Sequence, residues 1–248
     1  MPRSTACAAR GWTRCSKRAG PWPWPWLWGT LRSSSQEAFA LDSHRKAATA
    51  WAAREFADEV VAVPGATLAS DESIREDTTV DQLSQLRPAF RPDGTVTAGS
   101  SSPLNDGAAG LLLADGAGLA ASGGRPLARI VSRAVSGVEP QRFGIGPVTA
   151  AARALERAGI GWSDLASVEL NEAFAAESLA CLAEWPQLDR SLVNPAGGAI
   201  ALGHALGCSG ARLLTTLAWR LHRRGGGYGL ASMCIGVGQG IAVVLEGA

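Results

Sequence analysis

Three side chains that can move protons or hold negative charge stand on three separate turns in the last third of the chain. His204 lies within the glycine-rich run GGAIALGHALG, Cys234 opens a second run, CIGVGQG, and Asn171 begins the motif NEAF. A histidine can act as a base near neutral pH, and a thiol beside glycine amides can be stabilised as a thiolate or adjoin an oxyanion. Together they indicate a site for proton transfer and oxyanion binding.

Each residue also has a plain structural interpretation. A single histidine such as His204 is often a core or surface residue, and a cysteine such as Cys234 in an apolar strand is often an inert buried group. Asn171 follows a strand and is a preferred residue for capping a helix, so it is also interpreted as an N-cap. We interpret Cys181 and Cys208 as packing residues.

The spacing G-x-G-x-G after Cys234 could suggest nucleotide binding, but that fingerprint requires a helix after the glycines. Residues 241–245 predict a strand there instead, so we reject this interpretation.

The composition argues against several classes of binding partner and of protein. The 248 residues carry a net charge of +1 and 18% charged residues, which argues against nucleic acid or a membrane surface as the main partner. The five cysteines form no C-x-x-C pair, so neither a metal site nor a redox motif is predicted. No apolar run reaches the ~20 residues of a membrane span, and no secretory signal is recognisable. We expect a cytoplasmic protein.

The first 33 residues differ from the rest. Five basic residues and no acid precede Gly20, and the run PWPWPWLW follows. Alternating prolines exclude a helix and favour an extended chain, so residues 1–33 are predicted to be unstructured. An arginine-rich, acid-poor start is also typical of an organellar transit peptide, which leaves a mitochondrial location as the alternative.

Periodicity and turn residues predict the elements of the remaining chain. The first part has a helix at 36–56, a short strand at 60–63, a helical turn at 83–86, a turn then a strand at 90–99, a buried strand at 108–114 and a loop at 116–124. The second part has strands at 128–136, 168–170, 229–234 and 241–245, the last two paired, and helices at 147–158, 173–183 and 210–223. This alternation predicts an α/β layer with a largely buried sheet.

The three turns together resemble the thiolase family of coenzyme A-dependent acyltransferases. NEAF at 171–174, GGAIALGH at 197–204 and CIG at 234–236 match its three C-terminal signatures in order and spacing. Residues 36–44 and 86–107 are similar to its CoA-binding loop region, so the resemblance covers roughly residues 34–247.

The resemblance implies a thiolase-like α/β fold of two similar halves stacked in five layers, in a homodimer or homotetramer. Residues 1–33 would then be a non-family segment, and residues 34–124 the remnant of the CoA-binding loop region and the end of the N-terminal half. Residues 125–248 would be a complete C-terminal domain. The N-terminal half would be largely missing, as in an N-terminally truncated thiolase.

The resemblance also implies roles. The counterpart of His204 activates a nucleophilic cysteine, that of Cys234 moves the α-proton of the substrate, and that of Asn171 holds a water that binds the thioester oxygen with the histidine. The Gly236 amide would serve the other oxyanion hole. The residues implied to bind substrate or CoA are Phe90, Ala98, Ser102, Ala173 and Phe174.

The implied reaction is thiolysis or Claisen condensation of acyl-CoA and 3-ketoacyl-CoA, with CoA as co-substrate, no other cofactor and no metal. One departure limits this expectation, because neither Cys7 nor Cys15 resembles the segment of the family that bears the nucleophile. Ala205 also stands where proline usually follows the histidine. We therefore expect a chain that is inactive alone. The alternatives are a non-catalytic CoA-binding or subunit-interaction fragment, or a hydrolase that uses Cys234 and His204.

Overall fold

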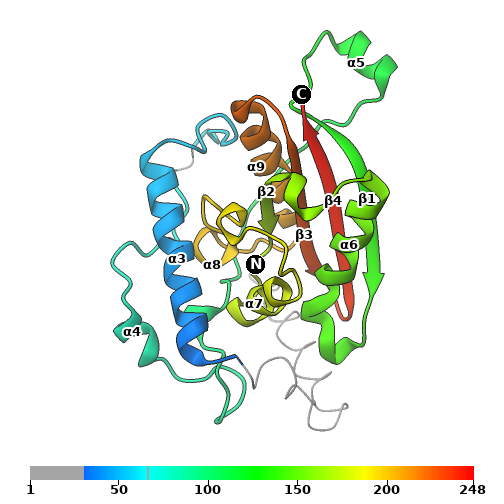
Figure 1. Ribbon diagram of the computed structural model, residues 1–248. Coiled ribbons are helices and arrows are strands. Elements are labelled where there is room, and N and C mark those ends of the chain that lie inside the picture. The colour runs from blue at the N-terminus through cyan, green and yellow to red at the C-terminus, as the bar shows by residue number, and fades with distance from the viewer. Residues whose placement is uncertain (1–30, 66) are drawn as a thin grey trace, which may run out of the picture.

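A computed structural model describes residues 31–65 and 67–248 (Figure 1). The prediction for the first 33 residues therefore lies almost entirely outside the described part. Four strands form one mixed sheet in the order β1-β4-β3-β2. These strands are β1 (Ala128–Gly137), β2 (Leu165–Leu170), β3 (Tyr228–Ile235) and β4 (Gln239–Gly247). β2 and β3 run parallel, while β4 is antiparallel to both of its neighbours.

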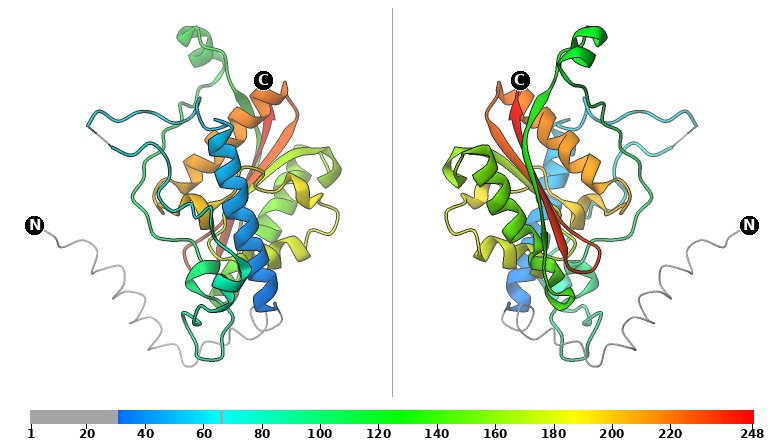
Figure 2. Two further views of the ribbon diagram at one scale, coloured as in Figure 1. Left: turned by 90° about the vertical axis from the view of Figure 1, so that its left-hand side faces the viewer. Right: turned by 90° about the vertical axis from the view of Figure 1, so that its right-hand side faces the viewer.

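Two long helices cover opposite faces of this sheet, as Figure 2 shows. The helix α6 (Gly146–Ala158) packs on the face that carries Leu230 and Val244. The helix α9 (Ser209–Arg224) packs on the face that carries Ala231 and Leu245. Neighbouring residues of β3 and β4 thus point to different cores, because side chains alternate along a strand. Burial on both faces explains why these strands have almost continuous apolar sequences.

A third layer holds α3 (Ser33–Ala52), which packs against α7 (Ala175–Ala183) and α8 (Ala199–Leu202). α3 approaches the turn before α8 so closely that a Cβ at Gly197 would lie 2.5 Å from the Ser43 carbonyl oxygen. The glycine, with φ of +76°, is required by both its backbone angle and this contact. The remaining elements are α4 (Val80–Ser84), η1 (Ala98–Ser100), α5 (Gly116–Ser122), η2 (Pro140–Ile145), η3 (Trp162–Asp164) and η4 (Arg190–Leu192).

The structure confirms the α/β layer and the elements predicted after residue 125, with ends that shift by one to three residues. It also confirms the long helix near the start as α3 and the short helical turn as α4. β3 and β4 pair directly, from Tyr228 with Glu246 to Ile235 with Gln239. A strand therefore follows the glycine run of Cys234, as predicted, where a dinucleotide-binding fingerprint requires a helix.

Three strand predictions are wrong. Residues 60–63 and 108–114 form no strand, and Val61 and Leu112 are 82% and 91% exposed. The strand within 90–99 is reduced to an isolated bridge between Pro88 and Thr97. An apolar run becomes a strand only where a neighbouring strand satisfies its backbone groups, and the described part of the chain provides no such neighbour.

Two helix predictions also need correction. Residues 116–122, predicted as a loop, form α5, which begins where the Asp115 carboxylate accepts the Gly118 N–H at 2.8 Å and ends at Gly123. α7 begins at Ala175 rather than at residue 173, and no side chain caps its first turn. Asn171 is therefore not its N-cap.

Candidate active site

The candidate site is built where the parallel strands β2 and β3 end. Leu170 pairs with Ser232, and the N–H of Asn171 donates to the Ser232 carbonyl at 2.9 Å. Cys234 lies two residues beyond Ser232 on β3, and residues two apart on a strand face the same side. Asn171 and Cys234 thus share the carboxyl edge of the sheet, the usual position of sites in α/β proteins.

His204 is brought to this edge by the turn after α8. At Gly203, with φ of +95°, a Cβ would lie 2.5 Å from the Asn105 amide oxygen, so only glycine permits this approach. The His204 backbone N–H donates to the Pro103 carbonyl at 3.1 Å, and residue 204 forms an isolated bridge with Leu104. The loop at 103–105 therefore fixes the height of the histidine above the sheet.

The hydrogen bonds of the His204 ring define its tautomer. The Ser209 hydroxyl donates to the Ala205 carbonyl at 3.0 Å, and its oxygen lies 2.7 Å from His204 Nδ1. With the single hydroxyl proton directed at the Ala205 carbonyl, Nδ1 carries a proton and donates it to Ser209. Nε2 then keeps a free lone pair and faces the Asn171 amide nitrogen at 3.4 Å. The ring is an acceptor on the side of Asn171.

The ring is also neutral. His204 is 9% exposed, and burial, together with the positive charge of Arg212, lowers its pKa below the ordinary value. Both effects disfavour the imidazolium. At neutral pH His204 can therefore accept a proton at Nε2.

Asn171 is fully buried, and its amide oxygen has no hydrogen-bond partner among the described residues. A buried amide oxygen without a partner is costly, and it can be satisfied by a water or a ligand. The side chain is turned toward His204 and not toward the helix that follows, which completes the correction of the cap interpretation.

Cys234 is half-buried at the end of β3. Burial, followed by the negative charge of Glu177, raises the pKa of its thiol well above the ordinary value. Gly236 lies in the exposed turn between β3 and β4, with φ of +53°. A thiol and an open backbone amide are therefore presented two residues apart.

Four of the five residues expected to bind CoA lie together. The rings of Phe90 and Phe174 meet edge to face, with centroids 5.8 Å apart. The backbone N–H and the hydroxyl of Ser102 both donate to the Ala173 carbonyl at 3.0 Å. Ala98 is exposed at the start of η1, in the same loop, and does not share these contacts.

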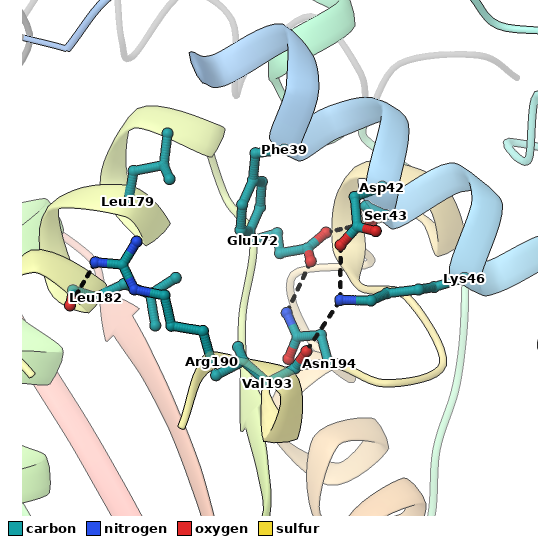
Figure 3. Close-up of a pocket in the computed structure, with 10 residues that line it drawn as sticks. All are labelled: Phe39, Asp42, Ser43, Lys46, Glu172, Leu179, Leu182, Arg190, Val193 and Asn194. Atoms are coloured by element: carbon teal, nitrogen blue, oxygen red, sulfur yellow. Dashed lines mark hydrogen bonds and ion pairs between the residues drawn. The ribbon is translucent and has the colours of Figure 1, made fainter. Parts of the chain in front are cut away.

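A buried polar network holds the motif NEAF in place (Figure 3). The Glu172 carboxylate accepts hydrogen bonds from the Ser43 hydroxyl at 2.6 Å and the Asn194 amide at 2.7 Å. Asn194 also bonds both backbone groups of Leu170. α3 is thereby tied to the end of β2, immediately before Asn171.

A pocket of about 150 Å³ opens beside this network. Its lining residues are Phe39, Asp42, Ser43, Lys46, Glu172, Leu179, Leu182, Arg190, Val193 and Asn194. None of the predicted catalytic residues lines it, so it is distinct from the edge that carries His204.

Sequence reasoning missed three residues that contact this site. Ser209 follows His204 by five residues and contacts its Nδ1. The Asn105 amide oxygen lies 3.4 Å from the His204 backbone nitrogen. Glu177 faces the Cys234 thiol from α7. Only Glu177 had a visible signal, as an acidic residue in an otherwise apolar helical pattern.

Within residues 31–65 and 67–248, no helix is both long and apolar enough to cross a bilayer. No group of three or more histidine, cysteine, aspartate or glutamate side chains in these ranges could hold a metal ion.

The fold and the site define a mixed α/β protein with a histidine, a thiol and an amide at the carboxyl edge of a buried sheet. Comparison with protein families agrees with this class: residues 124–247 match the C-terminal domain of thiolase, and residues 29–117 match its N-terminal domain. The chain belongs to the thiolase family.

Individual relatives give the same result. The chain is 52% identical over 221 residues to a 3-ketoacyl-CoA thiolase of Erwinia tasmaniensis, covering 85% of this chain and 57% of the relative. It is 49% identical to the 3-oxoadipyl-CoA/3-oxo-5,6-dehydrosuberyl-CoA thiolase of Escherichia coli, covering 87% and 56%. The chain thus spans a little over half the length of these relatives.

Solved structures show the same fold. The acetyl-CoA acetyltransferase of Bacillus anthracis superposes with a TM-score of 0.82 at 41% identity, over 88% of this chain and 57% of that one. Human mitochondrial 3-ketoacyl-CoA thiolase in complex with CoA gives 0.82 at 40% identity, over 89% and 56%. The thiolase-like fold predicted from the motifs is confirmed over this span.

Proposed function

We propose that this chain carries the enolate-forming part of a thiolase site, which binds acyl-CoA or 3-ketoacyl-CoA and moves the α-proton of the acyl group. The observation that carries the proposal is the pair of His204 and Asn171, 3.4 Å apart, with an unsatisfied amide oxygen on Asn171 at the edge that also holds Cys234. A polar site left open in a buried position is suited to a ligand oxygen or a water.

The proposed roles are those that membership of the thiolase family implies. Cys234 as thiolate takes the α-proton, and the electron pair of the broken C–H bond moves toward the thioester oxygen. The Asn171 oxygen holds a water that donates to this oxygen. Neutral His204 carries the lone pair of Nε2 on the side of Asn171 and would act on a thiol only where a nucleophilic cysteine is supplied. The Gly236 amide donates to a second developing oxyanion.

Coenzyme A is proposed as co-substrate, bound along the loop of Phe90 and Ser102. The edge-to-face ring pair with Phe174 provides an apolar wall, and the fixed Ser102 backbone provides a rigid rim. The human relative at 40% identity has been solved with CoA, which supports this class of ligand for the chain.

Covalent acyl transfer is proposed to be absent when this chain acts alone. It needs a cysteine beside His204 Nε2, and among the described residues the hydrogen bonds of this ring go only to Asn171 and Ser209. Thiolysis of acetoacetyl-CoA by the purified chain should therefore be at the background rate. Turnover at a rate typical of an enzyme would refute this part.

A second candidate is a non-catalytic CoA-binding or subunit-interaction chain that joins other thiolase subunits in a dimer or tetramer. The exposed leucines Leu104, Leu112 and Leu113, which are 78%, 91% and 71% exposed, favour it, since exposed apolar surface can mark contact sites. Stable co-purification with a full-length thiolase, without α-proton chemistry, would support this candidate over the first.

Binding is tested by protection of Cys234 from iodoacetamide. We expect saturating CoA to slow alkylation of the Cys234 peptide at least several-fold, and Phe90→Ala to weaken this protection. Leu68→Ala removes a similarly exposed apolar side chain from another loop (62% against 64% exposed) and should leave protection unchanged. Alkylation that CoA does not slow would contradict an organised site at Cys234, and with it both the proposed function and the hydrolase alternative.

A further inference from the structure

A buried carboxyl that the steps above do not use faces Cys234 from α7. Glu177, in the first turn of α7, is completely buried. The Cys234 thiol and the backbone amides of Ala173 and Phe174 act on its carboxyl, although no hydrogen bond of ordinary geometry satisfies either oxygen within the described residues. A buried carboxyl with unfilled capacity beside a thiol can exchange a proton with it.

Packing holds this carboxyl in place. A Cβ at Gly144 would lie 2.9 Å from the Glu177 Cγ, so η2 closes tightly over the side chain. Cys181 lies one turn further along α7, and its thiol donates to the Gly144 carbonyl at 3.3 Å. Glu177 therefore cannot turn out to water when it loses its proton.

Few groups shift the pKa values of Glu177 and Cys234. Burial raises the pKa of Glu177 to about 8, and the charge of Glu172 adds to this, whereas the Cys234 thiol and the two amides lower it. Burial and Glu177 also raise the pKa of the neighbouring Cys181. Glu177 acts on the pKa of Cys234 through its charge and as a hydrogen-bond partner, and the Cys181 thiol also interacts with Cys234. Because the raised pKa keeps Cys181 protonated, a proton that leaves Cys234 has Glu177 as its near acceptor.

We propose that Glu177 is the positioning residue that receives the thiol proton of Cys234 and so supplies the thiolate of the enolate-forming step. The S–H bond of Cys234 breaks and an O–H bond forms on the Glu177 carboxylate, so that the pair keeps its single negative charge. The thiolate then takes the α-proton, the S–H bond re-forms, and the electron pair of the C–H bond stays on the acyl group as an enolate. This role rests on the proposed function, but the coupling of the two groups does not.

The coupling is tested by the pH dependence of Cys234 alkylation in the full chain, read by mass spectrometry between pH 6 and 10. Glu177→Gln keeps the shape and removes the titration. The native rate should rise about tenfold per pH unit and flatten near pH 8, where the pair loses its first proton. In Glu177→Gln the rise should continue without this inflection. Profiles of the same shape would overturn the proposal.

Glu184→Gln is the matched control, because Glu184 is an exposed acid at the end of the same helix. It should keep the native inflection, and loss of the inflection in this control would overturn the proposal. If Glu177 had only a structural role, Glu177→Gln would lower the stability of the chain without changing the shape of the pH profile of Cys234 alkylation.

A second measurement does not depend on the folding of the Glu177 variant. In Cys234→Ala, the Glu177 carboxyl, followed by carbon NMR, should titrate at a higher pH than in the native chain, because the thiol that favours its ionised form is gone. An unchanged or lowered midpoint would overturn the proposal. If CoA fails to protect Cys234 while the profiles still differ, the proposed function fails and the coupled pair stands.

Discussion

At the scale of single residues, the proton positions in the site follow from one serine. When Ser209 donates its hydroxyl proton to the Ala205 carbonyl, it accepts a hydrogen bond from His204 Nδ1, and Nε2 is left as an acceptor. Burial and the charge of Arg212 then lower the pKa of the ring and favour its neutral form. The base role proposed for His204 therefore depends on Ser209 and Arg212, which have no proposed contact with substrate.

Ser209→Ala should remove the preference for the Nδ1–H tautomer of His204. We expect nitrogen NMR of His204 to show a larger share of the Nε2–H form, and the free energy of unfolding to fall by about 0.5–1.5 kcal/mol for the lost hydrogen bonds. Thr215→Ala removes a hydroxyl that also bonds a carbonyl four residues back on α9 and should leave the ring unaffected. An unchanged tautomer in Ser209→Ala would contradict the assignment.

A second histidine makes stability depend on pH. His44 is buried and its Nδ1 accepts the Arg75 N–H at 3.2 Å, while burial and the charge of Arg75 lower its pKa. Because the unfolded chain binds this proton more readily, the contribution of His44 is complete above its unfolded pKa of about 6.5 and is lost as the pH falls through the lower folded pKa.

Denaturation in urea between pH 7.5 and 5 measures this dependence. The stability advantage of the native chain over His44→Gln should shrink as the pH falls. A stability advantage that is constant, or that grows as the pH falls, would contradict the predicted direction of this pH dependence.

At the scale of elements, close backbone contacts position the site more than side-chain pairs do. Gly240 on β4 lies against α6, and a Cβ there would be 2.1 Å from the Gly146 carbonyl carbon. This contact sets the distance between η2, which covers Glu177, and the strand that pairs with Cys234.

Gly240→Ala should lower the free energy of unfolding by about 1–3 kcal/mol or more, because the backbone must move to accept the methyl group. Gly137→Ala is the control, since no atom within 4 Å would meet a Cβ on that strand glycine. Equal stability of the two variants, measured in urea, would show that the approach of β4 to α6 is not tight.

The elements show what a sequence can predict. The strands that became β1 to β4 and the helices that became α6 and α9 were predicted because apolar periodicity and glycine turns agree over long stretches. Residues 108–114 have an equally good strand pattern but lie exposed, since a pattern does not tell whether a neighbouring strand exists. α5 was missed because its small residues have no apolar period.

The site was only partly predictable for a similar reason. His204, Cys234 and Asn171 stand in recognisable motifs, so their types and order could be read directly. Ser209 acts through a contact that its spacing from His204 does not reveal, and Glu177 stood out only as an acidic residue in an apolar helical pattern. Asn171 was interpreted as a cap because a strand end and a helix start look alike in the sequence.

At the scale of the whole molecule, the chain presents one edge of a buried sheet as an organised site and leaves apolar residues exposed elsewhere. Leu112 and Val61 lie on loops outside the three packed layers. The chain spans a little over half of its relatives, yet the residues proposed for enolate formation all come from within it. The proposed proton chemistry is thus separable from covalent acyl transfer.

The most direct measurement of this claim is the exchange of the acetyl protons of acetyl-CoA with deuterium from the solvent, followed by proton NMR in the presence of the chain. We predict exchange well above the rate without protein, abolished in Cys234→Ala and lowered in Asn171→Ala, without detectable thiolysis of acetoacetyl-CoA. Exchange no faster than in buffer, by a folded chain that binds CoA, would contradict the account.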